Sequence, residues 1–406
     1  MSSPYAGRAM PASPRLLTPS ASDPGTPVVV AARRTPIGTA GRSLARLDTT
    51  DLAAPVLRAL AERVATLGGT ADVDEVVLGN CTGPGGDPAR VAALAAGLGT
   101  HVPGLTVDRQ CASGLEAVAV AAGRVVTGAR LVLAGGVESA STAPTRLALQ
   151  ADGSRVPYAR ARFSPDELGD PGMGEAADAL AAVRGISRER QDAYAVRSHS
   201  RTLAARDTGS FADELVPVAG VAVDERPRRG LDLSTLARFR PAFTAGGTVT
   251  AGNACGVNDG AAAVAVVDEG TRAALGLPGL AIRAVAARGV DPRLPGLGPV
   301  PAVRAVLAAG GLGVADVGTF EVTEAFAVQV LACTDELGLD PLDGDADRVC
   351  PDGGAIALGH PWGASGALLV VRLFARMLGS DVGRYGVATC AVGGGQGVAV
   401  LFERVG

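Results

Sequence analysis

The chain contains no lysine, so all 37 of its Lys and Arg residues are arginines. Without a lysine amine, the protein cannot form a Schiff base with a carbonyl substrate or build the lysine-containing phosphate loop of nucleotide-binding enzymes. Aromatic residues make up only 3% of the chain, and no apolar run approaches the length of a membrane span. The net charge of −4 and the lack of basic clusters argue against nucleic acid as a partner. Arginine and alanine in place of lysine are typical of a GC-rich bacterial genome.

Cysteine occurs six times, and no two cysteines form a C-x-x-C pair. In a chain this long, that spacing indicates free thiols in a reducing compartment, not disulfide bonds or a zinc site. Residues 1–25 are rich in serine, proline and alanine and lack the apolar core of a signal peptide. We therefore expect a disordered tail over residues 1–25, no metal site and a cytoplasmic location.

Apolar runs alternate with helical patterns along the rest of the chain. The runs at 28–32, 75–78 and 130–134 are continuous, as in strands that are buried on both faces of a sheet. Residues 51–67 and 187–208 have helical spacing. A more charged stretch with several prolines interrupts this alternation. We expect an α/β fold whose N-terminal half is formed by residues 26–139 and 248–275, with an inserted domain at 140–247 and a C-terminal half at 276–406.

The stretch T-V-D-R-Q-C-A-S-G-L-E-A-V, residues 106–118, places a cysteine between an expected strand and an expected helix. A thiol at a helix N-terminus feels the positive end of the helix dipole, and free N–H groups there can bind substrate oxygens. Both effects lower the pKa of a cysteine and favour a nucleophile at Cys111. The alternative is a small buried side chain without a chemical role.

An internal repeat relates this stretch to the C-terminal part of the chain. Residues 111–114 are followed by a helix, a strand and the pair Gly135–Gly136, and residues 363–366 are followed by a helix, a strand and three glycines at 393–395. Two copies of one strand–turn–helix–strand unit would bring two helix N-termini together. The repeat therefore predicts that Cys111 faces the second turn, which carries His360.

Only three histidines could serve as a base. His101 lies in a loop and His199 in a polar helical stretch, whereas His360 lies in the glycine-rich stretch G-G-A-I-A-L-G-H-P-W-G-A-S-G. Glycines let the backbone approach a ligand closely, and a cysteine nucleophile needs a base nearby. We therefore favour His360 as the base, with a purely structural histidine as the alternative.

The chain resembles the thiolase family over residues 26–406. The matching stretches are V-V-V-A-A-R-R-T-P-I-G, R-Q-C-A-S-G-L, A-G-G-V-E-S, G-T-V-T-A-G-N-A-C-G-V-N-D-G-A-A-A, T-E-A-F-A, the stretch around His360 and the closing G-G-G-Q-G. They occur in the order that the family has, which indicates the fold more strongly than any single match.

The resemblance implies a five-layered αβαβα fold of two similar halves, with an inserted loop domain that binds coenzyme A. It implies an acyl-CoA C-acyltransferase that acts as a homodimer or homotetramer on an acyl-CoA or acyl-carrier thioester, with no permanently bound cofactor. Cys111 would take the acyl group with His360 as its base, and N–H groups at Cys111 and Gly393 would stabilise the oxyanion. By position, the residues at the pantetheine channel would be Met173, Phe243, Cys255, Ala325 and Phe326, with core aromatics as the alternative for the two phenylalanines.

Two departures from the family pattern bear on the chemistry. Thr323 stands where the family has an asparagine that holds a water beside the histidine, and a threonine hydroxyl lacks the two N–H donors of an amide. Ala391 stands where the family has a second reactive cysteine, which moves a proton at the α-carbon. Cys390 lies one residue earlier, and in a strand this offset turns its side chain to the opposite face. Cys390 could serve as the base only if a bulge re-aimed it, and a buried thiol is the alternative.

Two milder departures are also cysteines. Cys255 replaces a usual serine that touches the coenzyme, and Cys81 replaces an aliphatic residue in a loop that is shorter than usual. Cys81 could alter the substrate pocket or a dimer contact.

Three functions stay open from the sequence. The first is a thiolase that cleaves or forms a 3-ketoacyl-CoA through an acyl-enzyme on Cys111. The second is a specialised acyltransferase or a decarboxylative condensing enzyme, in which loss of CO₂ supplies the carbanion and no base is needed. The third is a non-catalytic partner or binding subunit with the same fold, which the presence of both Cys111 and His360 disfavours.

Overall fold

The structure is a computed structural model of the chain, and it describes residues 20–69, 72–158 and 160–406. Most of the predicted disordered tail, residues 1–19, lies outside the described residues. Residues 20–25 are ordered in turns that precede the first strand, and Ala21 among them is buried.

The first part of the chain supplies three helices, five strands of four or more residues and one strand of two residues. They are β1 (Pro27–Arg34), β2 (Gly38–Thr39), α1 (Thr49–Thr66), β3 (Glu75–Gly79), α2 (Pro88–Ala95), β4 (Gly104–Val107), α3 (Ser113–Val126), β5 (Leu131–Ser139) and, after the insertion, β8 (Asn258–Asp268). The expected strands and helices at 28–32, 51–67, 75–78 and 130–134 are thus confirmed within a few residues.

The insertion and the second part follow the same alternation of helices with strands. The insertion contains β6 (Arg146–Leu149), β7 (Arg155–Tyr158), η1 (Asp166–Leu168), α4 (Met173–Arg184), α5 (Arg188–Asp207) and α6 (Leu233–Leu236). The second part contains α7 (Glu269–Ala274), β9 (Gly279–Gly289), η2 (Pro295–Leu297), α8 (Pro299–Gly310), η3 (Val314–Asp316), β10 (Val317–Val322), α9 (Ala327–Leu337), α10 (Ala355–Leu358), α11 (Trp362–Gly379), β11 (Tyr385–Val392) and β12 (Gln396–Val405). The domain boundaries at 139/140 and 247/248 stay predictions.

Ten strands of the described residues form one mixed sheet with the path β10-β11-β12-β9-β1-β8-β5-β3-β4, and β2 pairs with β8. The order β3-β5-β8-β1 in the first part matches the order β10-β11-β12-β9 in the second. Each begins with a parallel pair and continues with two antiparallel pairs. The two half-sheets join where Val28 and Val29 of β1 pair with Ala281 and Leu280 of β9. This topology agrees with the internal repeat that the sequence predicts.

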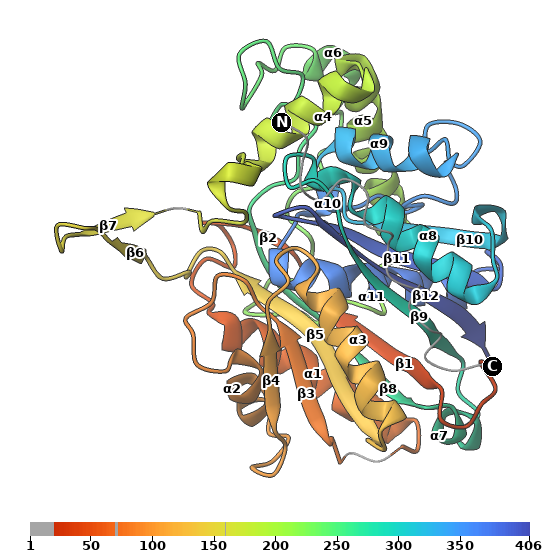
Figure 1. Cartoon of the computed structure of the whole chain (residues 1–406). Coiled ribbons are helices and arrows are strands. Elements are labelled where there is room, and N and C mark those ends of the chain that lie inside the picture. Colours follow the sequence, from red (N-terminus) through yellow and green to blue (C-terminus); the bar gives the residue numbers. More distant parts are fainter. Residues whose placement is uncertain (1–19, 70–71, 159) are drawn as a thin grey trace.

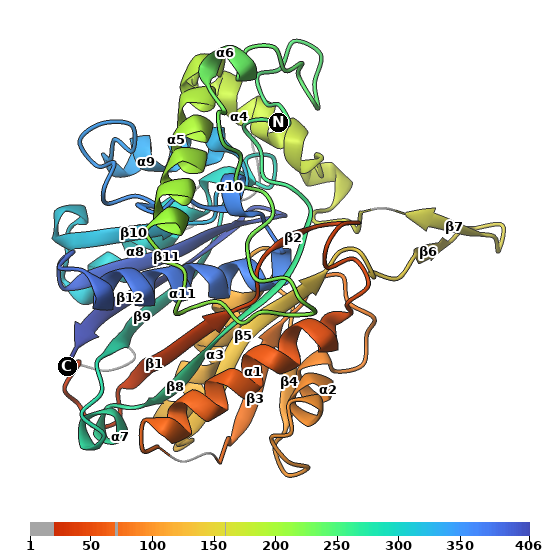
Figure 2. The same ribbon diagram turned by 180° about the vertical axis from the view of Figure 1, so that it is seen from behind.

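Five layers result from this arrangement, as Figures 1 and 2 show. Helices α3 and α11 pack against each other in the central layer, and both contact strands of the two half-sheets. Helices α1 and α2 cover the outer side of the first half-sheet, and α8 covers the outer side of the second. The strands are apolar on both faces, as in β5, where all nine residues are buried. The predicted αβαβα fold is confirmed.

Helix α11 is the one helix among the described residues that is long and apolar enough to cross a membrane by length and composition alone. Our expectation that no segment approaches this length was therefore wrong for residues 362–379. The helix is this apolar because it lies in the central layer, where two half-sheets cover it and most of its residues are buried. An apolar helix with this much burial is a core helix of the fold.

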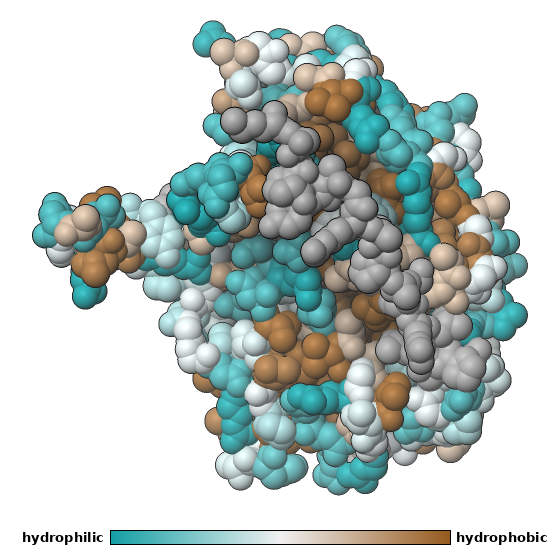
Figure 3. Space-filling model, viewed as in Figure 1, coloured by the Kyte–Doolittle hydropathy of each residue, from teal (hydrophilic) through white to brown (hydrophobic). Residues whose placement is uncertain are grey.

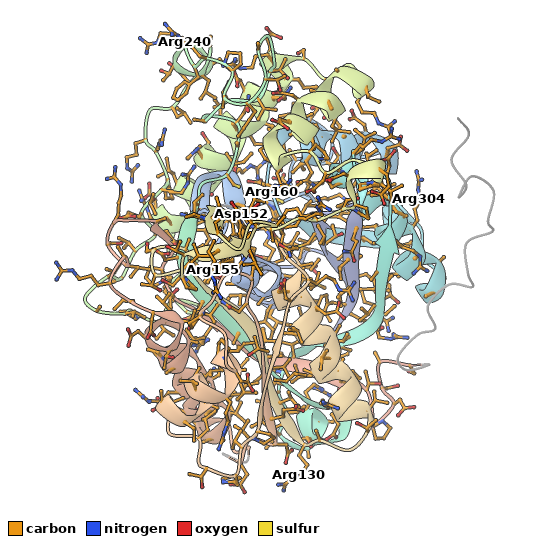
Figure 4. All side chains as sticks on the ribbon, turned by 60° about the vertical axis from the view of Figure 1, so that its left-hand side comes forward. Arg130, Asp152, Arg155, Arg160, Arg240 and Arg304 are labelled. Atoms are coloured by element: carbon orange, nitrogen blue, oxygen red, sulfur yellow. The ribbon has the colours of Figure 1, made fainter. Side chains whose placement is uncertain are left out.

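The insertion lies on one side of the layered body (Figure 1). Its hairpin β6–β7 projects away from the body and carries the exposed apolar side chains of Leu147, Leu149 and Val156, and Figure 3 shows brown atoms at its tip. Helices α4, α5 and α6 lie above the sheet, and Figure 4 shows Arg240 pointing outward from the loop after α6.

A buried network of ion pairs ties the insertion to the central layer. Arg34 at the end of β1 donates to Glu214 at 2.6 Å and to Asp224 at 2.7 Å, and all three side chains are almost fully buried. Arg372 of α11 pairs with the same Glu214 and with Asp352. Because removing one partner of a buried pair leaves an uncompensated charge, these contacts hold the loop after α5 against the end of the sheet.

Glycines allow the N-termini of α3 and α11 to meet. A Cβ at Gly114 would lie 2.7 Å from the backbone nitrogen of Ala367, and a Cβ at Gly79 would lie 2.7 Å from the carbonyl oxygen of Gly363. A Cβ at Gly136 of β5 would collide with the same carbonyl oxygen. The two helices can therefore cross at this point only because these positions lack a side chain.

We expect the variant Gly136→Ala to lower the free energy of unfolding by about 1–3 kcal/mol, because its methyl group forces apart β5 and the start of α11. Urea unfolding monitored by circular dichroism measures this. Gly123→Ala is the matched control, since no atom lies within 4 Å of a Cβ at Gly123 in α3. The control variant should be more stable by roughly 0.5–1 kcal/mol, as expected for alanine in a helix. Equal stability of the two variants would contradict the close contact.

Candidate active site

Cys111 lies in a tight turn between β4 and α3. Gln110, which precedes it, has a φ angle of 48°, a left-handed conformation that is uncommon for a residue with a side chain. The hydroxyl of Ser113 holds this turn, because it accepts from the N–H of Arg109 at 2.8 Å and donates to the carbonyl of Gln110 at 2.7 Å. Helix α3 begins at Ser113 without a side-chain cap. N–H groups of its first turn therefore stay available at the helix end that follows Cys111.

Burial, and then the neighbouring Cys390 and Cys255, raise the pKa of the Cys111 thiol above its ordinary value. This is opposite to the lowered pKa that we expected from the helix dipole alone. The physical reason is that loss of water disfavours the thiolate more than the helix end stabilises it. Cys111 is therefore a neutral thiol at neutral pH and needs a base to become a nucleophile.

His360 lies in the short connection between α10 and α11. Its backbone N–H donates to Oδ1 of Asn258 at 3.0 Å, and its Nδ1 lies 2.6 Å from the hydroxyl of Ser365. The side chain is 2% exposed, and its Nε2 is a buried atom without a hydrogen-bond partner in the described part of the chain. Burial lowers the pKa of His360 to about 4, so the imidazole is neutral at neutral pH. In the tautomer in which Nδ1 donates to the Ser365 hydroxyl, the free Nε2 can accept a proton.

A cavity of about 120 Å³ contains the two reactive side chains. Its walls are mostly apolar and come from both halves of the chain and from α4 of the insertion. The lining residues are Cys111, Met173, Ala176, Ala177, Leu180, Cys255, Pro295, Gly296, Ala325, Phe326, Gln329, His360, Trp362, Ala391, Val392 and Gly393. Seven of the residues singled out from the sequence thus lie together here: Cys111, His360, Gly393, Met173, Cys255, Ala325 and Phe326.

Two of the predicted catalytic residues do not line this cavity. The hydroxyl of Thr323 lies 2.7 Å from the sulfur of Cys390, and both side chains are buried. Cys390 packs in the hydrophobic core behind Cys111, and its thiol reaches the Cys111 carbonyl at 3.6 Å. Ala391 and Val392, at the end of β11, line the cavity instead. β11 pairs with β12 in continuous register from Tyr385 to Val392, so no bulge re-aims Cys390.

Phe243 also lies outside the cavity. Its ring is about half exposed and meets the ring of Phe326 edge-on, with 6.0 Å between the ring centroids. It also contacts Gly174 at the start of α4, where a Cβ would collide with the ring. Phe243 therefore supports the wall that Phe326 and Met173 form, and it does so from the solvent side.

Several residues that position the site were not singled out from the sequence. Ser365 and Asn258 hold His360, and Glu138 of β5 accepts from the N–H of Gly363 at 2.9 Å and from that of Cys81 at 3.1 Å. All three stand in the motifs that carry the family resemblance, which was the available signal. Trp362 and Gln329 also line the cavity. Their spacing from His360 and Phe326 in the sequence did not indicate that their side chains reach the cavity. The described residues contain no group of His, Cys, Asp or Glu side chains that could hold a metal ion.

Comparison with known proteins adds independent information about this chain. The family model for the thiolase N-terminal domain matches residues 27–270, and the model for the thiolase C-terminal domain matches residues 278–404. The acetyl-CoA acetyltransferase of Pseudomonas aeruginosa is 42% identical over 396 residues, which cover 93% of this chain and 99% of that protein.

Two further proteins are similar over nearly the whole chain. The 3-oxoadipyl-CoA/3-oxo-5,6-dehydrosuberyl-CoA thiolase of Escherichia coli is 43% identical over 396 residues, covering 92% of this chain and 98% of that protein. The crystal structure of the acetyl-CoA acetyltransferase of Bacillus anthracis superposes with a TM-score of 0.85 at 36% identity, covering 94% of this chain and 99% of that one.

We expect alkylation of Cys111 by iodoacetamide to accelerate about tenfold per pH unit between about pH 6 and pH 9, because only the thiolate reacts and its pKa is raised. His360, with its pKa lowered to about 4, is uncharged over this range and cannot stabilise a thiolate. Mass spectrometry of the Cys111 peptide measures the rate, and Cys111→Ala identifies the signal of the other thiols. A rate that is already on a plateau below about pH 7 would indicate a thiolate–imidazolium pair and would contradict this description.

Proposed function

The chain belongs to the thiolase family and is an acyl-CoA C-acyltransferase of thiolase type, and from this premise we propose that Cys111 carries the acyl group while the protein cleaves or forms a 3-ketoacyl-CoA. The observation that supports this role best is the shared cavity, in which the Cys111 thiol and the unpartnered Nε2 of His360 are enclosed by apolar walls.

His360 acts as the base for Cys111. Both groups are neutral before substrate binds, so the thiol proton moves to Nε2 when the sulfur attacks the substrate carbonyl. Nδ1 lies 2.6 Å from the Ser365 hydroxyl, and in the tautomer that this role requires, Nδ1 carries the ring proton and donates to that hydroxyl, which leaves Nε2 free to accept a proton. Covalent transfer to Cys111 then divides one difficult acyl exchange into two easier steps.

Backbone N–H groups stabilise the oxyanion that forms during each attack. The uncapped first turn of α3 supplies donors next to Cys111, and Gly393 brings the backbone of the β11–β12 turn to the cavity. Gly394 and Gly395 both have a φ angle of 80°, a conformation that glycine adopts without strain and that shapes this turn. Donors held in a dry cavity stabilise a developing charge strongly, because no water has to reorganise.

The substrate is a coenzyme A thioester, with an acyl-carrier thioester as the other source of the same pantetheine arm. Met173, Ala325 and Phe326 form an apolar wall that suits this arm, and Phe243 backs it from outside. No permanently bound cofactor takes part in this chemistry, because the thioester already activates the acyl group.

We also propose a homodimer or homotetramer in the cytoplasm. Among the described strands, β4 ends the sheet path and pairs only with β3, so a second copy can extend its other edge. The projecting β6–β7 hairpin with its exposed apolar residues offers a further contact. All six cysteines are free, which fits a reducing compartment.

A second candidate function is favoured by Ala391. This residue leaves the cavity wall without a thiol at the position where the family has its second cysteine. An acyltransferase or a decarboxylative condensing enzyme needs no base there, since loss of CO₂ would supply the carbanion.

Cleavage of a panel of 3-ketoacyl-CoAs by coenzyme A tests the proposal, with absorbance and product mass as readouts. We expect turnover by the unaltered protein and a loss of roughly 10⁴-fold or more in Cys111→Ala, which lacks the nucleophile. Cys333→Ala is the control, because it removes a buried thiol outside the cavity and should keep turnover. Turnover that survives in Cys111→Ala would contradict the role of Cys111, and an acylated Cys111 without turnover would favour the second candidate.

A further inference from the structure

Cleavage of a 3-ketoacyl thioester has a chemical requirement that Cys111 and His360 do not meet. When the bond between the keto carbon and the α-carbon breaks, its electron pair stays on the departing thioester, and that carbon must receive a proton. The proton of Cys111 is already on His360 at this point and is needed again when Cys111 leaves the acyl group. A further proton donor must therefore face the cavity, if the proposed function holds.

The lining of the cavity restricts the candidates. Among the described residues that form its wall, only three side chains titrate: Cys111, His360 and Cys255. Gln329 also lines the cavity, but its side-chain amide does not release a proton. Cys390 is separated from the cavity because its side chain packs in the core beside Thr323. By elimination, Cys255 is the remaining donor.

The backbone around Cys255 fixes its place relative to His360 and Phe326. Ala254 forms a β-bridge with Phe326, and Val257 forms a β-bridge with His360. The N–H of Cys255 donates to the carbonyl of Ala325 at 3.0 Å. The same segment continues to Asn258, which accepts from the N–H of His360. Cys255 is thus held in the framework that holds the base.

The surroundings of Cys255 suit a thiol that gives up a proton and takes it back. Burial raises the pKa of Cys255 to about 12, and Glu324 also raises it, while the cation of Arg226 opposes this shift. Arg226 lies against Gly256, where a Cβ would collide with its guanidinium group, and it donates to the carbonyl of Ile356 at 3.3 Å. The thiol is therefore protonated at rest, and the partly buried cation of Arg226 stabilises the thiolate that forms.

We propose that Cys255 is the second acid–base residue of the reaction and protonates the α-carbon of the departing thioester. In cleavage, the proton of Cys111 passes to Nε2 of His360, the sulfur of Cys111 bonds to the keto carbon, and the bond to the α-carbon breaks. The electron pair of that bond takes the proton of Cys255 and leaves a thiolate there. Coenzyme A then gives its thiol proton to Cys255 and takes the acyl group, and Cys111 recovers its proton from His360. In synthesis the steps run backward, with the Cys255 thiolate as the base.

Two measurements on the full-length protein separate this inference from the proposed function. Formation of the acetyl-enzyme from acetyl-CoA, followed by intact mass, can proceed with Cys111 and His360 alone, because the departing coenzyme A can take from Nε2 of His360 the proton that Cys111 gave up. Exchange of the methyl hydrogens of acetyl-CoA with D₂O, followed by mass spectrometry, needs the second acid–base residue. Cys255→Ser and Cys255→Ala are the test variants, and Cys390→Ser is the matched control, since it makes the same thiol-to-hydroxyl change outside the cavity.

We expect both Cys255 variants to form the acetyl-enzyme at the rate of the unaltered protein, which also demonstrates that they fold. Their hydrogen exchange and thiolysis should fall by ~10²- to 10⁴-fold, the usual effect of losing a positioned acid–base residue. Cys390→Ser should keep the hydrogen exchange and the thiolysis of the unaltered protein. Exchange that is unchanged in Cys255→Ser, or that is lost in Cys390→Ser instead, would overturn the role of Cys255. An unaltered protein that forms no acetyl-enzyme would overturn the proposed function, and this inference with it.

Discussion

The close crossing of α3 and α11 is the constraint on which the site depends. Gly79, Gly114 and Gly136 place no side chain between the two helix N-termini, and Gly363 lies at the point of contact. The two half-sheets repeat one topology, so the crossing places corresponding turns of the repeat against each other. One turn carries Cys111 and the other carries His360, and the chemistry follows from this symmetry.

Burial at this crossing decides the charge state of both reactive groups. It raises the pKa of the Cys111 thiol and lowers the pKa of His360 to about 4, so the resting site holds two neutral groups. A neutral pair avoids the cost of burying two charges, and charge develops only when substrate carbons and N–H donors are in place to share it. Ser365 and Asn258 then matter because they hold the ring and the backbone of His360, whose Nε2 has no hydrogen-bond partner in the described part of the chain.

Much of this site was predictable from the sequence, for physical reasons that also explain the failures. The small residues after Cys111 and the glycines around His360 indicated two tight turns, and the repeat indicated that they meet. The alternation of side chains in a strand predicts that Cys390 and Ala391 lie on opposite faces, and the pairing of β11 with β12 continues past both without a bulge. The place of Cys255 was not predictable in this way, because it lies in an irregular segment between two isolated bridges, where no periodicity sets the direction of a side chain. The pKa of Cys111 was also mispredicted, since its sign depends on how far the fold removes water from the thiol.

In the proposed reaction Cys111, beside a neutral His360, carries the acyl group. Incubation of the protein with acetyl-CoA, acid quenching and mass spectrometry of the cysteine peptides tests it most directly. We expect one acetyl group per chain on the peptide that contains Cys111, and none in the variant His360→Ala at the same time point. An acetyl group on another cysteine, or an unmodified Cys111 peptide under turnover conditions, would contradict it.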